Sequence, residues 1–210
     1  MPRGGPLDGR RRIVCALAAI FGALLPATAS AHPHVFIDNR VTFLFAENKI
    51  VGFRENWLFD DVFSDQLLQD FDGDGDGQFS KAESDKIATE TLPNLAQFHY
   101  FTFIWVDGKP LAKIPPKDFH ASAKNKLVTF DFMVTLPKPI DPLNQDIAVE
   151  INDREYFVEV LLAKDTPIAF KELTGKALTG PVCEPSVTKD EKNAYYGGFV
   201  YPQQIKLKCK

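Results

Sequence analysis

The residues with the clearest metal-binding chemistry lie in one short stretch, residues 72–83, in which acidic residues alternate with glycines. An EF-hand loop surrounds calcium with oxygen ligands from its positions one, three, five, seven, nine and twelve, and a glycine at position six allows the sharp turn. Gly77 falls at position six here, and each ligand position holds a suitable residue: Asp72, Asp74, Asp76, the backbone carbonyl of Gln78, Ser80 directly or through a water, and Glu83 with both carboxylate oxygens. The spacing therefore predicts a calcium site.

The segments on both sides of this stretch have helical periodicity. Phe63, Leu67 and Phe71 recur at helical spacing before it, with Asp60 or Asp61 as a capping residue. Residues 84–90 then favour a second helix, which ends near Pro93. We therefore expect a helix–loop–helix EF-hand insertion over about residues 60–95. The sequence contains no second loop of this type, so we expect the single loop to bind calcium weakly.

The first 31 residues have the pattern of a cleavable signal peptide. A basic segment around Arg10 precedes an apolar run over residues 13–25, and the run is followed by Ala29, Ser30 and Ala31, an A-x-A cleavage site. The apolar run is too short for a membrane anchor. We expect cleavage after Ala31, a mature domain over residues 32–210, and a periplasmic location. Three consecutive arginines leave twin-arginine export open beside general secretion.

Composition limits the partners of the mature chain. Cleavage leaves 210 − 31 = 179 residues, and it removes four arginines and one aspartate, so 24 − 4 = 20 basic and 28 − 1 = 27 acidic residues remain and the net charge is 20 − 27 = −7. With no basic stripe, we expect neither nucleic acid nor an anionic membrane surface as a partner. No second long apolar segment follows, so we expect no membrane insertion after cleavage.

Two cysteines, Cys183 and Cys209, remain in the mature chain. In an oxidising compartment two cysteines are expected to form one disulfide, which here would tie down the C-terminal tail. A metal-binding or redox role is the alternative, and the absence of C-x-x-C spacing makes it the weaker one.

The mature chain would begin with His32, Pro33 and His34. A terminal histidine offers its amine and its ring nitrogen, and His34 adds a second imidazole, a ligand set that suits copper, nickel, cobalt or zinc. Pro33 has no N–H and so blocks the copper and nickel site that uses deprotonated backbone amides. Any site here would be brace-like and completed by another side chain, for which the candidates are Asp38, His99 and His120. The alternative is a solvated histidine pair that binds nothing.

The remainder of the sequence predicts a mainly β protein. Strands are expected where β-branched and aromatic residues alternate with polar ones, and prolines at 137, 139 and 142 predict a loop. The expected strands are residues 34–45, 50–58, 100–106, 111–114, 127–136, 147–151, 156–162 and 204–209. Short strands with turn residues between them favour an antiparallel β-sandwich with one helical insertion, α+β overall. The sequence has no nucleophile elbow, H-E-x-x-H motif, P-loop or dinucleotide fingerprint, and we expect no enzyme activity.

Several of these stretches together resemble one bacterial family. They are residues 32–38, 57–60, 72–83, 100–101, 106–109 and 153–157. The family comprises exported proteins of unknown function labelled as periplasmic components of an uncharacterised ABC-type transport system, and the resemblance covers the mature chain to about residue 162. Its members are often encoded beside nickel/cobalt permeases, which implies transition-metal handling and an inner-membrane permease as partner. Tyr156 and Phe157 stand where the family commonly has two tyrosines, and the chain is short for a two-lobed solute-binding protein.

Three functions are compatible with these observations. The first is a metal-binding accessory of a nickel/cobalt-type transport system, with the terminal histidines as the transport-metal site. The second is a calcium-stabilised interaction module without a transition-metal role. The third is a copper enzyme with an N-terminal histidine brace. We favour the first, because the terminal histidines and the resemblance both point to transition metals.

Overall fold

The computed structural model describes residues 33–174 and 180–210. The chain divides into two units, Met1–Ala31 and His32–Lys210, and the second holds all of the described residues. The predicted signal peptide and His32 lie outside them. Within the described ranges, no helix is long and apolar enough to cross a membrane.

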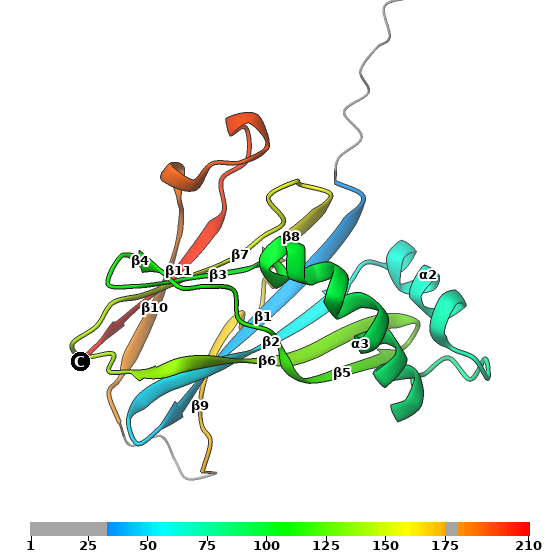
Figure 1. Ribbon diagram of the computed structural model, residues 1–210, viewed down its shortest axis with the longest axis horizontal. Coiled ribbons are helices and arrows are strands. Elements are labelled where there is room, and N and C mark those ends of the chain that lie inside the picture. Colours follow the sequence, from blue (N-terminus) through cyan, green and yellow to red (C-terminus); the bar gives the residue numbers. More distant parts are fainter. Residues whose placement is uncertain (1–32, 175–179) are drawn as a thin grey trace, which may run out of the picture. The chain divides into compact units, whose positions relative to one another are not determined.

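The larger of two sheets, sheet A, is built around the strand that follows the predicted cleavage site (Figure 1). Its main path runs β5-β6-β2-β1-β8, and β9 also pairs with β1. The strands are β1 (Val35–Ala46), β2 (Lys49–Phe59), β5 (Lys117–Lys124), β6 (Leu127–Ile140), β8 (Val158–Leu162) and β9 (Ile168–Glu172). The strands β1, β2 and β6 pair antiparallel, as predicted, and β5, which was not among the expected strands, pairs antiparallel with β6. In contrast, β8 and the equally unexpected β9 both pair parallel to β1.

The smaller sheet, sheet B, has the order β10-β11-β7-β3-β4 and is antiparallel throughout its described pairs. Its strands are β3 (Thr102–Val106), β4 (Lys109–Pro110), β7 (Ile147–Ile151), β10 (Cys183–Lys189) and β11 (Gln203–Cys209). Residues of both sheets, among them Phe43, Trp57, Val149 and Ile205, join one buried core. The prediction of a mainly β protein with two sheets is confirmed.

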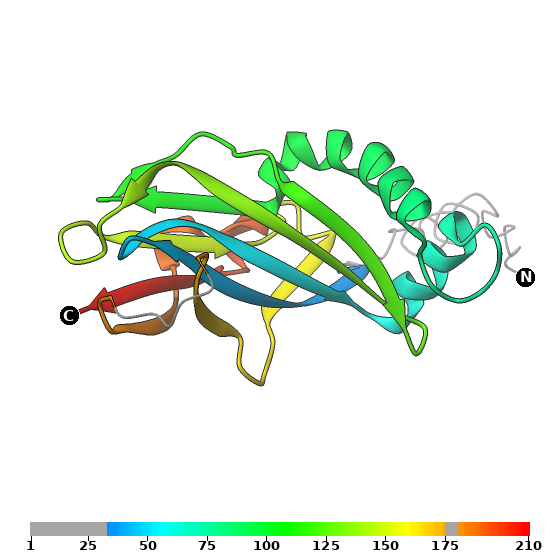
Figure 2. The same cartoon turned by 90° about the horizontal axis from the view of Figure 1, so that it is seen from below.

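Two helices, α2 (Asp61–Phe71) and α3 (Lys81–Leu95), lie against sheet A (Figure 2). A buried serine in each helix forms a hydrogen bond with sheet A. The Ser64 hydroxyl oxygen accepts from the N–H of Val128 at 3.0 Å, and the Ser84 hydroxyl oxygen accepts from the N–H of Ala121 at 2.8 Å. These bonds satisfy backbone groups of β6 and β5 and hold the helices at fixed positions on the sheet. Short 3-10 helices span Ala96–Phe101 (η1), Glu191–Asn193 (η2) and Tyr196–Gly198 (η3).

Some expected elements differ from the structure. The expected strand over residues 111–114 is absent: β4 covers only Lys109 and Pro110, and after it the N–H of Leu111 donates to the carbonyl of Ile104 at 2.9 Å. The expected loop at residues 137–140 is instead the end of β6, where the prolines occupy exposed positions beside a register shift that a proline tolerates. The strand expected from residue 100 begins at Thr102, because Tyr100 and Phe101 have positive φ.

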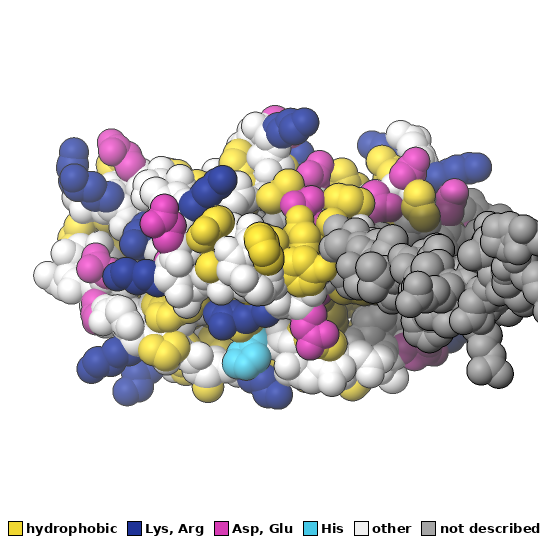
Figure 3. All heavy atoms as spheres, turned by 90° about the horizontal axis from the view of Figure 1, so that it is seen from above, with side chains coloured by type: hydrophobic (Ala, Val, Ile, Leu, Met, Phe, Trp, Pro, Cys, Tyr) yellow, Lys and Arg dark blue, Asp and Glu magenta, His cyan; other side chains and the backbone are white. Residues whose placement is uncertain are grey.

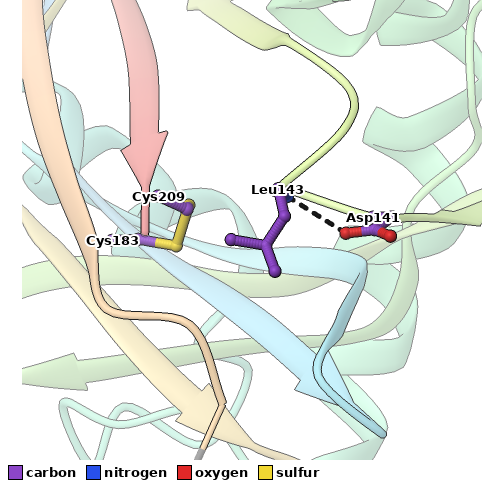
Figure 4. Close-up of a disulfide and its surroundings, with 4 residues drawn as sticks. All are labelled: Asp141, Leu143, Cys183 and Cys209. Carbon is purple, nitrogen blue, oxygen red and sulfur yellow. Dashed lines mark hydrogen bonds between the residues drawn. A yellow bond between two sulfur atoms is a disulfide. The ribbon is translucent and has the colours of Figure 1, made fainter.

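A disulfide joins the first residue of β10 to the last residue of β11. Cys183 and Cys209 are directly paired in the ladder, and their sulfurs are bonded. Figure 4 shows the Leu143 side chain directed toward this bond from the loop after β6, where the Leu143 N–H donates to Asp141 at 3.0 Å. The predicted pairing of the two mature cysteines is thus present in the structure, and it fastens the C-terminal strand to its neighbour.

Thiol titration tests this disulfide in the protein itself. We expect the processed, denatured and unreduced protein to contain essentially no free thiol, because cleavage of the predicted signal peptide would remove Cys15 and the other two cysteines are bonded. Addition of reductant should release two thiols per chain. A disulfide-linked dimer on a non-reducing gel, or two thiols before reduction, would contradict the pairing.

Candidate metal centre

The acidic stretch predicted to bind calcium is the loop between α2 and α3, and both helix ends are capped at it. Asp60 begins α2 by accepting from the N–H of Phe63 at 2.9 Å. Ser80 begins α3 in a capping box with Glu83, in which each side chain accepts from the backbone N–H of the other residue. Phe79, beside this cap, is buried in the core and anchors the end of the loop. The helix ends therefore fix both ends of the loop.

Three aspartates converge within the loop. One carboxylate oxygen from each of Asp72, Asp74 and Asp76 lies within 4.8 Å of the others. The two Asp72 oxygens accept from the N–H groups of Gly75 at 2.9 Å and Gly77 at 2.8 Å. Gly77 has φ +79°, a conformation that a residue with a Cβ adopts only with strain. The loop backbone thus folds around the carboxylates, and the carboxylate oxygens converge. A hard cation is bound by convergent oxygen ligands of this kind.

Glu83 connects the two ends of the loop. Its carboxylate accepts from the N–H of Gly73 at 2.7 Å and from the N–H and the hydroxyl of Ser80, both at 2.8 Å. The bonds from the Ser80 N–H, the Ser80 hydroxyl and the Gly73 N–H lower the pKa of Glu83. Glu83 is the residue predicted to complete the calcium coordination, and these bonds hold its side chain ionised beside the loop.

Mutual repulsion marks the aspartates as a crowded anionic group. A hydrogen bond from the N–H of Asp76 lowers the pKa of Asp74, but the negative charges of Asp76 and Glu83 and partial desolvation outweigh it, so the pKa is raised. A divalent cation at this position would relieve that repulsion. Of the other two predicted ligands, Gln78 donates its N–H to Asp76 at 2.8 Å, and Ser80 binds Glu83. The predicted ligand residues thus lie on the loop, except Glu83, which lies in the first turn of α3.

The predicted histidine site is only partly within the described residues. His34 is exposed, its N–H donates to the carbonyl of Phe157 at 2.8 Å, and its ring centroid lies 4.8 Å from that of Phe157. Asp38 is four residues further along β1, about 13 Å of strand away. His120 is on β5, three strand positions from β1, or about 14 Å. The structure therefore does not bring Asp38 or His120 together with His34.

His99, the remaining candidate ligand, lies in η1 with positive φ. Its ring stacks on Phe103, with 5.2 Å between centroids, and the guanidinium of Arg154 also lies over the Phe103 ring, 4.1 Å from its centroid. Among the described residues, the group of three converging metal ligands consists of aspartates and includes no histidine.

A buried glutamate that the sequence analysis did not single out links the two sheets. Glu55 on β2 is fully buried; it accepts from the Trp57 indole N–H at 2.8 Å, and its Oε1 lies 2.8 Å from the Thr102 hydroxyl on β3. That hydroxyl also lies 3.0 Å from the Tyr100 carbonyl oxygen. A hydroxyl has one hydrogen and a carbonyl only accepts, so both bonds form together when Glu55 is protonated and donates to Thr102. Burial, opposed by the bonds to Thr102 and Trp57, raises the pKa of Glu55 to about 7.

A second buried glutamate, Glu150 of β7, is bonded to β11 and to the segment that precedes it. The side-chain amide nitrogen of Gln204 donates to Glu150 and to Asp190, at 2.7 Å each, and Asn193 bridges the same carboxylates at 3.4 and 3.1 Å. Burial, together with a hydrogen bond to Asp190, raises the pKa of Glu150 to about 7. No spacing in the sequence predicts this cluster, because its members come from β7, β11 and the loop between β10 and β11.

The described surface in Figure 3 has interspersed charges. Lysine and arginine side chains alternate with acidic and hydrophobic ones, and no continuous basic stripe crosses the part of this face that the structure describes. On this face, therefore, nothing resembles the positive track that binds a phosphate backbone.

Sequence comparisons relate the chain to proteins without an assigned activity. An uncharacterized protein of Haemophilus influenzae is 24% identical over 207 residues, covering 91% of this chain and 97% of the relative. An uncharacterized 15.5 kDa protein in the trpE 3' region of Spirochaeta aurantia is 30% identical over 137 residues, covering 65% of this chain and 93% of the relative. The family model described as "Protein of unknown function (DUF1007)" matches residues 17–205. The chain therefore belongs to the DUF1007 family.

Proposed function

We propose that this protein is an exported, periplasmic calcium-binding protein that serves as a metal-binding accessory of a nickel/cobalt-type transport system, and that it binds metal without catalysing a reaction. The observation that carries the calcium part is the convergence of Asp72, Asp74 and Asp76 on a loop whose ends are joined by Glu83. The loop has the ligand order of an EF-hand, and α2 and α3 flank it as an EF-hand requires.

Calcium in this loop would stabilise the fold and would not act as a switch. The loop is single, so we place its dissociation constant in the weak class of about 10⁻⁴–10⁻³ M that extracellular modules use. The buried serines of α2 and α3 already hold the helices to sheet A, which leaves little freedom for a large opening of the helix pair. Calcium would then reinforce a helix pair that is fixed by the sheet.

The calcium prediction is tested by melting. At ten times its dissociation constant, calcium should stabilise the protein by about 1.4 kcal/mol. Glu83→Gln should lose most of this gain, because a bidentate carboxylate becomes a single carbonyl ligand. Glu90→Gln, the same change at an exposed position of α3 outside the loop, should keep it. Melting temperatures that are equal in calcium and in chelator would show that the loop does not bind calcium.

The transition-metal part of the proposal depends on the mature N-terminus. His32 would supply its amine and ring and His34 a second ring, with an inner-membrane permease as the partner that receives the ion. Because His34 is exposed at the start of β1 and its N–H is bonded to Phe157, its imidazole has a fixed attachment point at the surface. Such a site would present the ion to another protein and would not enclose it.

Calorimetric titration with nickel, cobalt, copper and zinc tests this site. We expect the correctly processed protein to bind one of these ions, and His32→Ala and His34→Ala to lose the binding. Affinity should fall as the pH drops through about 6.5, where histidine protonates. His120→Ala, on the opposite edge of sheet A, should change nothing. If the processed protein binds no better than free histidine, the calcium-stabilised interaction module is the better description.

A further inference from the structure

A cavity of about 230 Å³ lies where sheet A meets the helix pair. Its walls include Ile37 of β1, Trp57 and Phe59 of β2, Phe63 of α2, Leu95 of α3 and Val158 of β8. Almost all of the lining is aliphatic or aromatic, and no charged residue contributes to it. No residue of the acidic loop lines the cavity, and its chemistry is that of an apolar binding site.

The cavity is open to solvent on one side and is not an enclosed void. Its apolar walls stay apart, although protein interiors pack as densely as organic crystals. Water that enters finds few polar partners, whereas a well-held water needs two to four. Ser64 and Ser84 hold α2 and α3 on backbone groups of β6 and β5, which opposes closure of the helices over the apolar walls. The fold therefore keeps an apolar surface accessible to a ligand.

The rim of the cavity carries its polar groups. The Thr91 hydroxyl is occupied, because it donates to the carbonyl of Ile87 at 2.7 Å. The side-chain nitrogen of Asn94 donates to the carbonyl of Glu90 at 3.0 Å, and Asn94 is exposed. The amide oxygen of Asn94 is thus oriented by its own helix and can accept a hydrogen bond at the mouth of the cavity.

We propose that this cavity binds a small, uncharged and largely apolar molecule, a medium-length aliphatic chain whose single hydroxyl group lies at the rim beside Asn94. The volume sets the size: a cavity of about 150 Å³ accommodates benzene, so about 230 Å³ accommodates roughly nine non-hydrogen atoms. The absence of charge in the lining disfavours an ionised head group inside. This proposal does not depend on calcium or transition-metal binding.

The indole of Trp57 reports directly on the cavity. Trp57 and Trp105 are the two tryptophans of the chain, and Trp105→Phe leaves Trp57 as the sole indole. Titration of the full processed protein carrying this change with 8-bromo-1-octanol should quench Trp57 fluorescence to a plateau, because bromine quenches at contact. Unbrominated 1-octanol should reverse the quenching by competition.

The same change, valine to phenylalanine, made at two positions distinguishes binding in the cavity from non-specific association. Val158→Phe fills the cavity and should weaken binding by about tenfold or more, whereas Val62→Phe adds the same volume at an exposed position of α2 and should leave it unchanged. Circular dichroism checks that each variant is folded. If Val158→Phe does not fold, Leu95→Phe fills the cavity from α3 and should give the same loss.

Three results would overturn the proposal. The first is quenching that is absent or does not saturate. The second is equal affinity in the wild type and in a folded cavity-filling variant. The third is a dimer in sedimentation that the cavity-filling variant dissociates, because the cavity would then be part of an interface between two copies.

Discussion

Glu55→Gln is expected to stabilise the protein at alkaline pH and to leave it nearly unchanged at acidic pH. The pKa of Glu55 is about 7 in the folded protein and near 4.5 when exposed. At a pH between these two values, Glu55 keeps its proton in the folded state and has released it in the unfolded state. The stabilising contribution is therefore complete below about pH 4.5 and is lost as the pH rises through about 7. This difference of about 2.5 between the two pKa values corresponds to roughly 3 kcal/mol of unfolding free energy.

Glutamine reproduces the neutral form of this side chain. Its carbonyl can accept from the Trp57 N–H, and its amide can donate to the Thr102 hydroxyl, which still donates to Tyr100. Urea denaturation at about pH 4 and pH 9 should thus show a clear gain for the variant only at the higher value. The control is Glu90→Gln, an exposed change that should be neutral at both. A variant less stable than the wild type at about pH 9 would mean that the native core favours the ionised form of Glu55, which a raised pKa excludes.

Gly52→Ala is expected to cost about 3 kcal/mol of unfolding free energy. Gly52 lies within β2, between β1 and β6, at the register shifts of both ladders. A Cβ at this position would lie 2.3 Å from the carbonyl oxygen of Val134 and 3.2 Å from the Cα of Thr135. Both atoms belong to the backbone of a central strand, so relief requires that the strand move.

Gly108→Ala is the matched control for this prediction. Gly108 has φ +73° and no atom within 4 Å of its ideal Cβ, so its substitution costs only the conformational strain, about 1 kcal/mol. Denaturant unfolding of the two variants separates steric clash from backbone preference. Equal losses in both would show that the register shift in sheet A adjusts to a side chain at no cost.

The strands that the sequence predicts well are those with one buried and one exposed face. In β1 the buried Val35, Ile37 and Val41 alternate with more exposed residues, and this period of two is visible in the sequence. Glu47 and Asn48 both adopt positive φ in the tight hairpin turn that follows. The parallel pairing of β8 and β9 with β1 is not encoded locally, because it depends on how segments far apart in the chain meet.

The same limit applies to predicting the candidate sites from the sequence: local patterns are visible in it, and contacts between distant segments are not. The order of residues in the acidic loop is a local property, and the structure places the predicted ligands on the loop between two helices and, for Glu83, in the first turn of the second. Glu55 and Glu150 stand among strand residues, and only the packing of a second element over them changes their pKa. Strand β10 was missed because most of its residues are exposed, so it lacks the alternation of a half-buried strand.

The parallel pairing of β1 with β8 and β9 sets how much of the chain must be available before sheet A can be completed. Val35 pairs with Val158 and Val41 with Ile168, whereas the other neighbour of β1 is β2, which directly follows it. A chain that emerges from its N-terminus first, whether from a ribosome or through a membrane, can therefore form the β1–β2 hairpin early. It cannot cover the other edge of β1 until β8 and β9 have emerged. Such distant contacts slow folding, because a long loop must close before they form. The interval before closure, with an unpaired edge next to an apolar core, is when this protein most needs protection from aggregation.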